Sequence, residues 1–106
     1  MDELTGESPP ARPEGGKPRF DTGRLVVTPG ALAAQEEAGQ HWMEFLSRHL
    51  AGDWGQLDEE DRKANDRALA CGERLLSAYP LVTGVTIWLI TEWDRSATTV
   101  LLPADY

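Results

Sequence analysis

Apolar residues recur at two different spacings along the chain, and the spacing changes at Gly72. Before Gly72, apolar side chains fall three and four residues apart, which is typical of helices that bury one face. After it, β-branched and aromatic residues come in short runs bounded by Gly, Pro, Asp and Ser, which is typical of strands. The pattern therefore predicts a helical half followed by a sheet half.

Three helices are predicted in the first half, over about 29–38, 41–50 and 58–71. Thr28 before Pro29 favours the start of the first helix, because Thr is a common N-cap and Pro is tolerated at the next position. Asp58 is expected to cap the third, whose first turn is acidic. Gly39 and Gly72 are typical helix ends.

Four strands are predicted, over about 24–28, 74–79, 85–91 and 98–102. The last three are joined by short connections, which make antiparallel neighbours. The order is then β-α-α-α-β-β-β. We expect an α+β fold, with a three- to four-stranded antiparallel sheet and helices packed on one face.

The strand over 85–91 is apolar on both faces. Alternate positions place Val85, Ile87 and Leu89 on one side and Trp88 and Ile90 on the other. Three helices in so short a domain are expected to cover only one side. The Trp88 side should then meet the first helix, the C-terminal residues or a second copy of the chain, which makes it a candidate partner surface.

The first 19 residues differ in composition from the rest of the chain. They contain four prolines and three glycines, and their only large apolar residues are Met1 and Leu4. Such a segment cannot bury enough surface to offset the entropy of ordering it. We predict a disordered tail over 1–19 and a single α+β domain over 20–106.

The formal net charge is −8, and a polyanion is repelled by such a chain. Direct binding of DNA or RNA is therefore not expected. The acidity indicates either simple solubility or, as an alternative, a surface that mimics DNA toward a nucleic-acid-binding protein. No apolar run is long enough to span a bilayer, and there is no signal-peptide pattern. With Cys71 as the single cysteine, predicted to fill the core, we expect a cytoplasmic protein.

No motif predicts a catalytic residue, a cofactor or a metal. The sequence lacks a Gly-rich phosphate loop and a nucleophile elbow. His41 and His49 are eight residues apart and have no second Cys or His to complete a zinc site. His49 is expected to be a hydrogen-bonded structural histidine.

A recognition edge is the alternative interpretation of the polar residues. Thr91 to Ser96 form the densest polar group outside the helices, and its simplest interpretation is a turn in which Arg95 pairs with Glu92 or Asp94. Asp61 is expected to pair with Arg74 or Arg95. Because Trp and Arg often anchor interfaces, the candidate interaction residues are Arg48, His49, Asp53, Trp54, Asp61, Trp88, Glu92, Asp94 and Arg95.

Several motifs together resemble a family of short bacterial proteins. They are Val27-Thr28-Pro29-Gly30-Ala31-Leu32, Phe45 to His49, Gly52-Asp53-Trp54-Gly55, Glu60-Asp61, Asn65, Gly72, Arg74 to Tyr79, Trp88, Ile90-Thr91-Glu92, Asp94 to Pro103, and Asp105-Tyr106. The resemblance covers 24–106, and the proline-rich tail departs from it. Such proteins recur on plasmids, phages and genomic islands, labelled plasmid-related or as type I restriction endonuclease subunit M. The resemblance implies no catalytic residues, and a methyltransferase domain would need a much longer doubly wound fold.

Three functional hypotheses follow. The first is a non-enzymatic protein of mobile genetic elements that binds another protein, with an anti-defence inhibitor as one version. The second is an accessory component of a restriction-modification or toxin–antitoxin system. The third is a small hydrolase-like enzyme using Asp61, His49 and Glu92.

Overall fold

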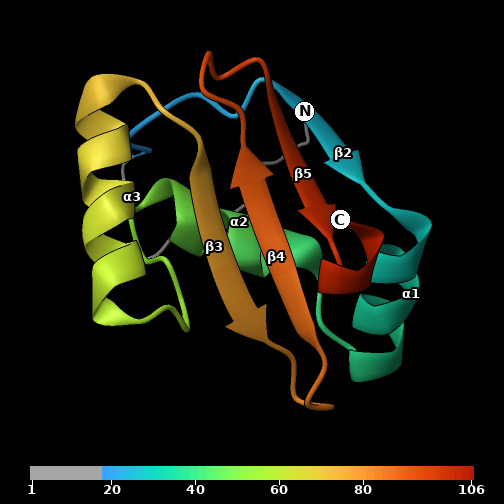
Figure 1. The fold of residues 1–106 in the computed structure, drawn as a ribbon. Coiled ribbons are helices and arrows are strands. Elements are labelled where there is room, and N and C mark those ends of the chain that lie inside the picture. Colours follow the sequence, from blue (N-terminus) through green and yellow to red (C-terminus); the bar gives the residue numbers. More distant parts are fainter. Residues whose placement is uncertain (1–17) are drawn as a thin grey trace.

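The computed structural model describes residues 18–106, and their elements follow the predicted order (Figure 1). The predicted tail lies outside the described residues except for Pro18 and Arg19. The strands are β2 (Arg24–Val27), β3 (Leu75–Pro80), β4 (Thr86–Thr91) and β5 (Ala97–Leu101). The helices are α1 (Pro29–Ala38), α2 (Trp42–Leu50), α3 (Glu59–Cys71) and the short 3-10 helix η1 (Pro103–Asp105). The fold is α+β, as predicted.

The helix boundaries lie where the capping residues predict them. The Thr28 hydroxyl accepts a hydrogen bond from the Ala31 N–H, and the Asp58 carboxylate accepts one from the Asp61 N–H. Gly39 and Gly72 end α1 and α3 in left-handed conformations. Within residues 18–106, no helix combines the length and the apolar character of a membrane span.

The sheet is mixed, which corrects the prediction of a purely antiparallel sheet. The strand order is β2-β5-β4-β3, and β2 pairs with β5 in parallel. The β3–β4 and β4–β5 pairs are antiparallel, as the short connections require. The connection from β2 to β3 contains three helices, so nothing local fixes the direction of β2. Its partner is chosen by tertiary packing.

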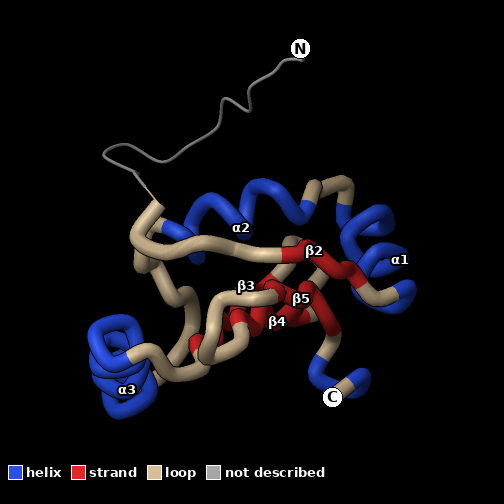
Figure 2. Tube along the Cα trace, turned by 90° about the horizontal axis from the view of Figure 1, so that it is seen from above, coloured by secondary structure: helices blue, strands red, loops and turns tan. Residues whose placement is uncertain are grey.

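One face of the sheet, here called the inner face, is covered by α1 and α2 (Figure 2). Phe45 and Leu46 of α2 and Ala31 of α1 pack there against strand residues of the main core. These strand residues and the adjoining Leu81 are all buried: Tyr79, Leu81, Ile87, Leu89 and Val100. Removal of this apolar surface from water is the main contribution to stability.

Helix α3 does not cover the face but lies alongside β3, at one edge of the sheet (Figure 1). Its contact is a smaller core of Trp54, Ala68 and Leu75, with Phe20, Leu57 and Leu69 packed around it. Cys71, at the end of this helix, is exposed, which corrects the prediction that it fills the core. Of the alanines on the same helix, Ala68 is buried and Ala64 is exposed.

The outward edge of β3 is closed by the chain itself. The Asn65 side chain donates to the Leu76 carbonyl at 2.6 Å and accepts from the Leu76 N–H at 3.1 Å. Two residues further along, the Ala78 N–H donates to the Trp54 carbonyl and the Ala78 carbonyl accepts from Gln56. Pro80 has no N–H to offer. Every outward donor of β3 is therefore occupied or absent.

Closure of this edge also explains why position 55, between Trp54 and Gln56, is a glycine. Gly55 has a φ of 77°, and a Cβ on it would lie 2.0 Å from the Ala78 carbonyl oxygen. Only glycine permits the backbone to approach β3 this closely.

Loss of the Asn65 amide should destabilise the fold. In Asn65→Ala the N–H and carbonyl of Leu76 lose both partners next to a packed helix, so the free energy of unfolding should fall by about 2–3 kcal/mol. Chemical denaturation measures this change. Arg67→Ala, an exposed neighbour on the same helix, is the control and should change stability by less than about 0.5 kcal/mol. Equal stabilities of the two variants would contradict the closure of the edge by Asn65.

Candidate interaction surface

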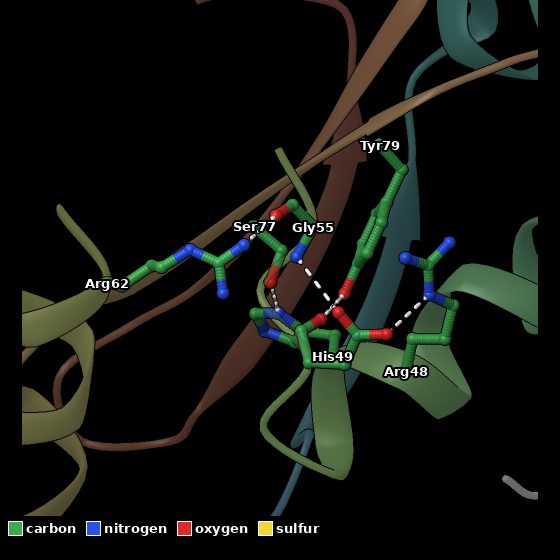
Figure 3. Close-up of polar contacts among 7 residues, drawn as sticks. Arg48, His49, Gly55, Arg62, Ser77 and Tyr79 are labelled. Atoms are coloured by element: carbon green, nitrogen blue, oxygen red, sulfur yellow. Dashed lines mark hydrogen bonds and ion pairs between the residues drawn. The ribbon is translucent and has the colours of Figure 1, made fainter. Parts of the chain in front are cut away.

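His49 lies at the centre of a chain of polar side chains that are all fully buried. Its Nδ1 atom is 2.6 Å from the Ser77 hydroxyl (Figure 3), and its Nε2 atom is 2.9 Å from the Thr91 hydroxyl. Thr91 in turn lies 2.7 Å from the Thr98 hydroxyl, which donates to the carbonyl of Thr22. The chain connects α2, β3, β4, β5 and the segment before β2.

The last acceptor fixes the direction of the hydrogen bonds from Thr98 back to His49. Because the Thr98 hydrogen goes to the Thr22 carbonyl, Thr98 must accept from Thr91. Thr91 must then accept from His49 Nε2–H. Burial keeps the imidazole neutral, so its one ring proton is on Nε2 and Nδ1 accepts from the Ser77 hydroxyl.

Burial, reinforced by the positive charge of Arg95, lowers the pKa of His49 from 6.5 to about 3. The Ser77–His49 contact has the spacing of a nucleophile and its base, but neither residue has any exposed surface. No substrate reaches Ser77 in this arrangement. His49 is the structural histidine that the sequence predicts.

The three residues of the enzyme hypothesis have separate partners. His49 bonds to Ser77 and Thr91, as described above. The Glu92 carboxylate lies 3.8 Å from Arg74. Asp61 is exposed in the first turn of α3, and only its N–H is engaged, with Asp58. None of these contacts connects His49, Asp61 and Glu92 to one another. Within residues 18–106, no group of His, Cys, Asp and Glu is suited to hold a metal ion.

Arg48, near the C-terminal end of α2, and Asp53, in the loop between α2 and α3, form a small polar cluster; Figure 3 labels Arg48. Arg48 Nε lies 2.8 Å from the Asp53 carboxylate, and its guanidinium lies 4.6 Å above the Tyr79 ring. Burial opposes ionisation of Asp53, but the bonds from Arg48 and from the Gly55 N–H outweigh it and lower its pKa. The cluster orders the loop that closes β3.

Trp54 is buried, which corrects the expectation that its turn presents the indole to a partner. Only 2% of the residue is exposed. The indole N–H donates to the Asp66 carboxylate at 3.1 Å, and the ring packs against Phe20 and His49. Trp54 belongs to the smaller core, so it is not available for recognition.

Arg95 also has a structural role, and the expected pairing with a carboxylate is wrong. Its guanidinium donates to the main-chain carbonyls of Ala68, Glu73 and Glu92 at 3.2, 2.6 and 3.1 Å. It thus places a positive charge at the C-terminal end of α3, where the helix dipole is negative. Asp61 lies at the other end of that helix, so it cannot be the partner of Arg95. Asp94 accepts from the Ser96 N–H, as the turn interpretation predicts.

The face of the sheet opposite the helices, here called the outer face, carries the remaining candidate, Trp88. Cross-strand register places one row of side chains on it from Val26, Thr99, Ile90 and Leu76, and a second from Leu101, Trp88 and Ala78. Of the possible covers for this face, the structure shows the C-terminal residues. Tyr106 packs edge-on against Trp88, with ring centroids 5.9 Å apart. Ala78, Ile90 and Leu101 are buried on this face, whereas Leu76 and Trp88 are half-buried.

A pocket of about 280 Å³ remains on the outer face, lined by Arg74, Leu75, Leu76, Trp88, Ile90 and Tyr106. Its floor is apolar. The Arg74 guanidinium donates to the Tyr106 hydroxyl at 2.8 Å and lies beside Glu92. Tyr106 is 70% exposed. The pocket therefore combines an apolar floor with an aromatic wall and, at its rim, the charge of Arg74.

Sequence reasoning found Trp88 but missed Arg74, Leu76 and Tyr106. Leu76 could have been found, because alternation along β3 places it on the same face as Ala78. Tyr106 and Arg74 meet across 32 positions of the chain. No local pattern signals such a contact.

Comparisons of the chain with family models, curated proteins and solved structures give no match. Its function is therefore inferred from the geometry of the described residues.

The neutral His49 predicts acid sensitivity. In the unfolded chain the pKa of His49 returns to about 6.5. Between pH 6.5 and pH 3, the unfolded state therefore binds a proton that the folded state does not bind. The free energy of unfolding should be highest above pH 6.5 and fall by roughly 1 kcal/mol per pH unit as the pH decreases toward 3.

Urea denaturation at pH 7.5 and pH 5 measures this slope in a range where most carboxylates stay ionised. His49→Gln removes the titrating group and should show a flatter profile, although it is less stable at pH 7.5. The exposed His41→Gln serves as the control and should keep the slope of the original protein. A steep profile in His49→Gln would contradict the assignment.

Two substitutions at Arg95 distinguish the contribution of its guanidinium hydrogen bonds from the strain of its backbone conformation. Arg95 is the one non-glycine residue among 18–106 with a positive φ, 61°. Arg95→Gly loses the three hydrogen bonds but tolerates this φ, whereas Arg95→Ala loses the bonds and remains strained. Both should be less stable than the original protein, and Ala should be the worse by about 1 kcal/mol. Thermal and chemical denaturation measure the order; equal stabilities would show that the strain is relieved.

Proposed function

We propose that this protein is non-enzymatic and acts by binding another protein through the outer face of its sheet. The observation that supports this proposal is the pocket between Trp88 and Tyr106, on the face that α1 and α2 leave uncovered. Trp, Tyr and Arg are the residue types that most often dominate binding energy at interfaces. Here they lie together around an apolar floor.

The interior supports binding rather than catalysis. The Ser77–His49 pair, which has the geometry for chemistry, is sealed beneath the N-terminal segment and Trp54. Arg48, Trp54 and Arg95 are engaged in holding the loops. Around the pocket, Trp88, Glu92, Arg74, Leu76 and Tyr106 remain for recognition. The candidates Asp61 and Asp94 are also exposed, but away from the pocket lining.

We further propose that the protein belongs with the short proteins of bacterial mobile elements that its sequence resembles, and that it works in the cytoplasm. Its partner in that setting would be a nuclease or restriction complex that it blocks. The alternative is a companion protein of a restriction-modification or toxin–antitoxin pair. The formal charge of −8 supports a partner that normally binds nucleic acid, because such a partner presents a basic surface.

Site-specific photo-cross-linking in the native host tests the outer face. A benzophenone amino acid replaces Leu76 or Tyr106, which border the pocket, or Val82, which is 76% exposed in the β3–β4 turn and does not line it. Positions 76 and 106 should give the same adduct, heavier than a dimer of this chain or distinct from it in composition. Position 82 should not.

A second change shows whether the pocket supplies the affinity. Trp88→Ala in the chain with the probe at position 106 should lower the adduct yield about ten-fold. Its circular dichroism spectrum should confirm that it remains folded. Equal yields from positions 76, 82 and 106, or an unchanged yield in folded Trp88→Ala, would rule out this surface.

A further inference from the structure

One edge of the sheet is covered by other parts of the described chain, and the other edge is not. The β3 edge is occupied by Asn65 and by the segment around Gly55, as described above. At the other edge, β2 pairs with β5 on one side, and no segment within residues 18–106 pairs with its outward side. An uncovered edge strand is a template for pairing with another strand.

The hydrogen bonds to β5 show which main-chain groups of β2 point outward. The N–H of Arg24 donates to Ser96 and that of Thr28 to Val100. Residues 24, 26 and 28 therefore face β5, and the N–H and carbonyl groups of Leu25 and Val27 point away from the sheet. The strand contains no proline and only one charge, and Leu25 and Val26 are each 40% exposed. Apart from the shortness of this four-residue strand and the charge of Arg24, the usual protections of an edge are missing.

We propose that two copies of this chain associate by antiparallel pairing of β2 with β2, around a two-fold axis at Val26. In this register Leu25 of each copy lies opposite Val27 of the other. Their outward N–H and carbonyl groups exchange both hydrogen bonds, which is the pattern of an antiparallel hydrogen-bonded pair. Val26 lies opposite its own copy as a non-hydrogen-bonded pair.

The charges around β2 favour this occupant. Arg24 lies opposite Thr28 of the second copy, and the Thr28 hydroxyl donates to the Asp105 carboxylate at 2.7 Å. Hydrogen bonds from Thr28 and Leu102 lower the pKa of Asp105, so this carboxylate is ionised at neutral pH. Each Arg24 therefore approaches an anion of the other copy, twice by symmetry. No like charges face each other in the strand pair, which is the condition for favourable cross-strand contacts.

The pairing has a consequence for the outer face. An antiparallel pair around an axis perpendicular to the sheet keeps the same face on the same side in both copies. The row of Val26, Thr99, Ile90 and Leu76 then continues into the second copy, and two Trp88 pockets lie on one surface. The helices α1 leave β2 at opposite ends of the pair.

Sedimentation equilibrium of the full chain, with Leu25→Pro as the test variant, measures the association. The original protein at about 100 µM should have twice the monomer mass. Leu25→Pro removes an outward N–H that β5 does not use, so it should weaken association at least ten-fold while the chain stays folded. Val82→Pro, in the exposed β3–β4 turn, is the control: it loses one hydrogen bond, from its N–H to the Gln40 side chain, far from β2, and should still dimerise.

A disulfide reports the register even if Leu25→Pro perturbs β2. In a Cys71→Ser background, Val26→Cys should form a covalent dimer under mild oxidation, whereas the more exposed Val82→Cys should not. A monomer at about 100 µM would overturn the proposal. So would equal cross-linking from positions 26 and 82. Neither result bears on the photo-cross-linking of the outer face, which uses other residues.

Discussion

The buried imidazole of His49 is the constraint on which the arrangement of this domain depends. A side chain with two polar nitrogens can be enclosed only if both find partners, because an unpaired buried polar group is costly. Ser77 and Thr91 supply them from two strands, and Thr98 extends the chain to the backbone of the N-terminal segment. The relative positions of α2, β3, β4 and that segment are therefore coupled, and Phe20 must lie over the ring to keep water out.

The packing around His49 determines which surfaces of the domain remain free for function. Two helices and a polar network occupy one face, and α3 with the Gly55 segment occupies one edge. Residues that look suited to recognition, such as Trp54 and Arg95, are used to hold these parts together. What the fold leaves is the opposite face and the opposite edge, and Val26 belongs to both of them. Binding of a partner and self-pairing are therefore adjacent but separate uses of the same sheet.

The sequence predicts those features that depend on neighbouring residues. Thr28, Asp58, Gly39 and Gly72 mark helix ends because capping is a local interaction. The two-sided apolar pattern around Trp88 likewise predicts an uncovered face, since alternation is local. The order of helices and strands along the chain and the α+β class follow from the same signals.

The remaining features depend on contacts between distant residues. The direction of β2 depends on packing, and α3 lies at an edge because Asn65 matches the main chain of Leu76, eleven positions away. Trp54 and Arg95 were assigned to an exposed edge because polar turns usually hold exposed side chains. Their actual partners are the Asp66 carboxylate and three main-chain carbonyls, and a sequence does not show which carbonyls need a donor.

The parallel pairing of β2 with β5 has a consequence for the order of folding. The first strand of the described chain has the last strand as its sheet partner, and the bond between Thr98 and the Thr22 carbonyl spans 76 positions. Contacts of such long separation form late, because the chain must lose the entropy of closing the loop before the contacts can stabilise it. During synthesis, Leu25 and Val26 therefore have no partner strand until residues 97–101 have emerged from the ribosome. A nascent chain is exposed to pairing with other strands throughout that interval.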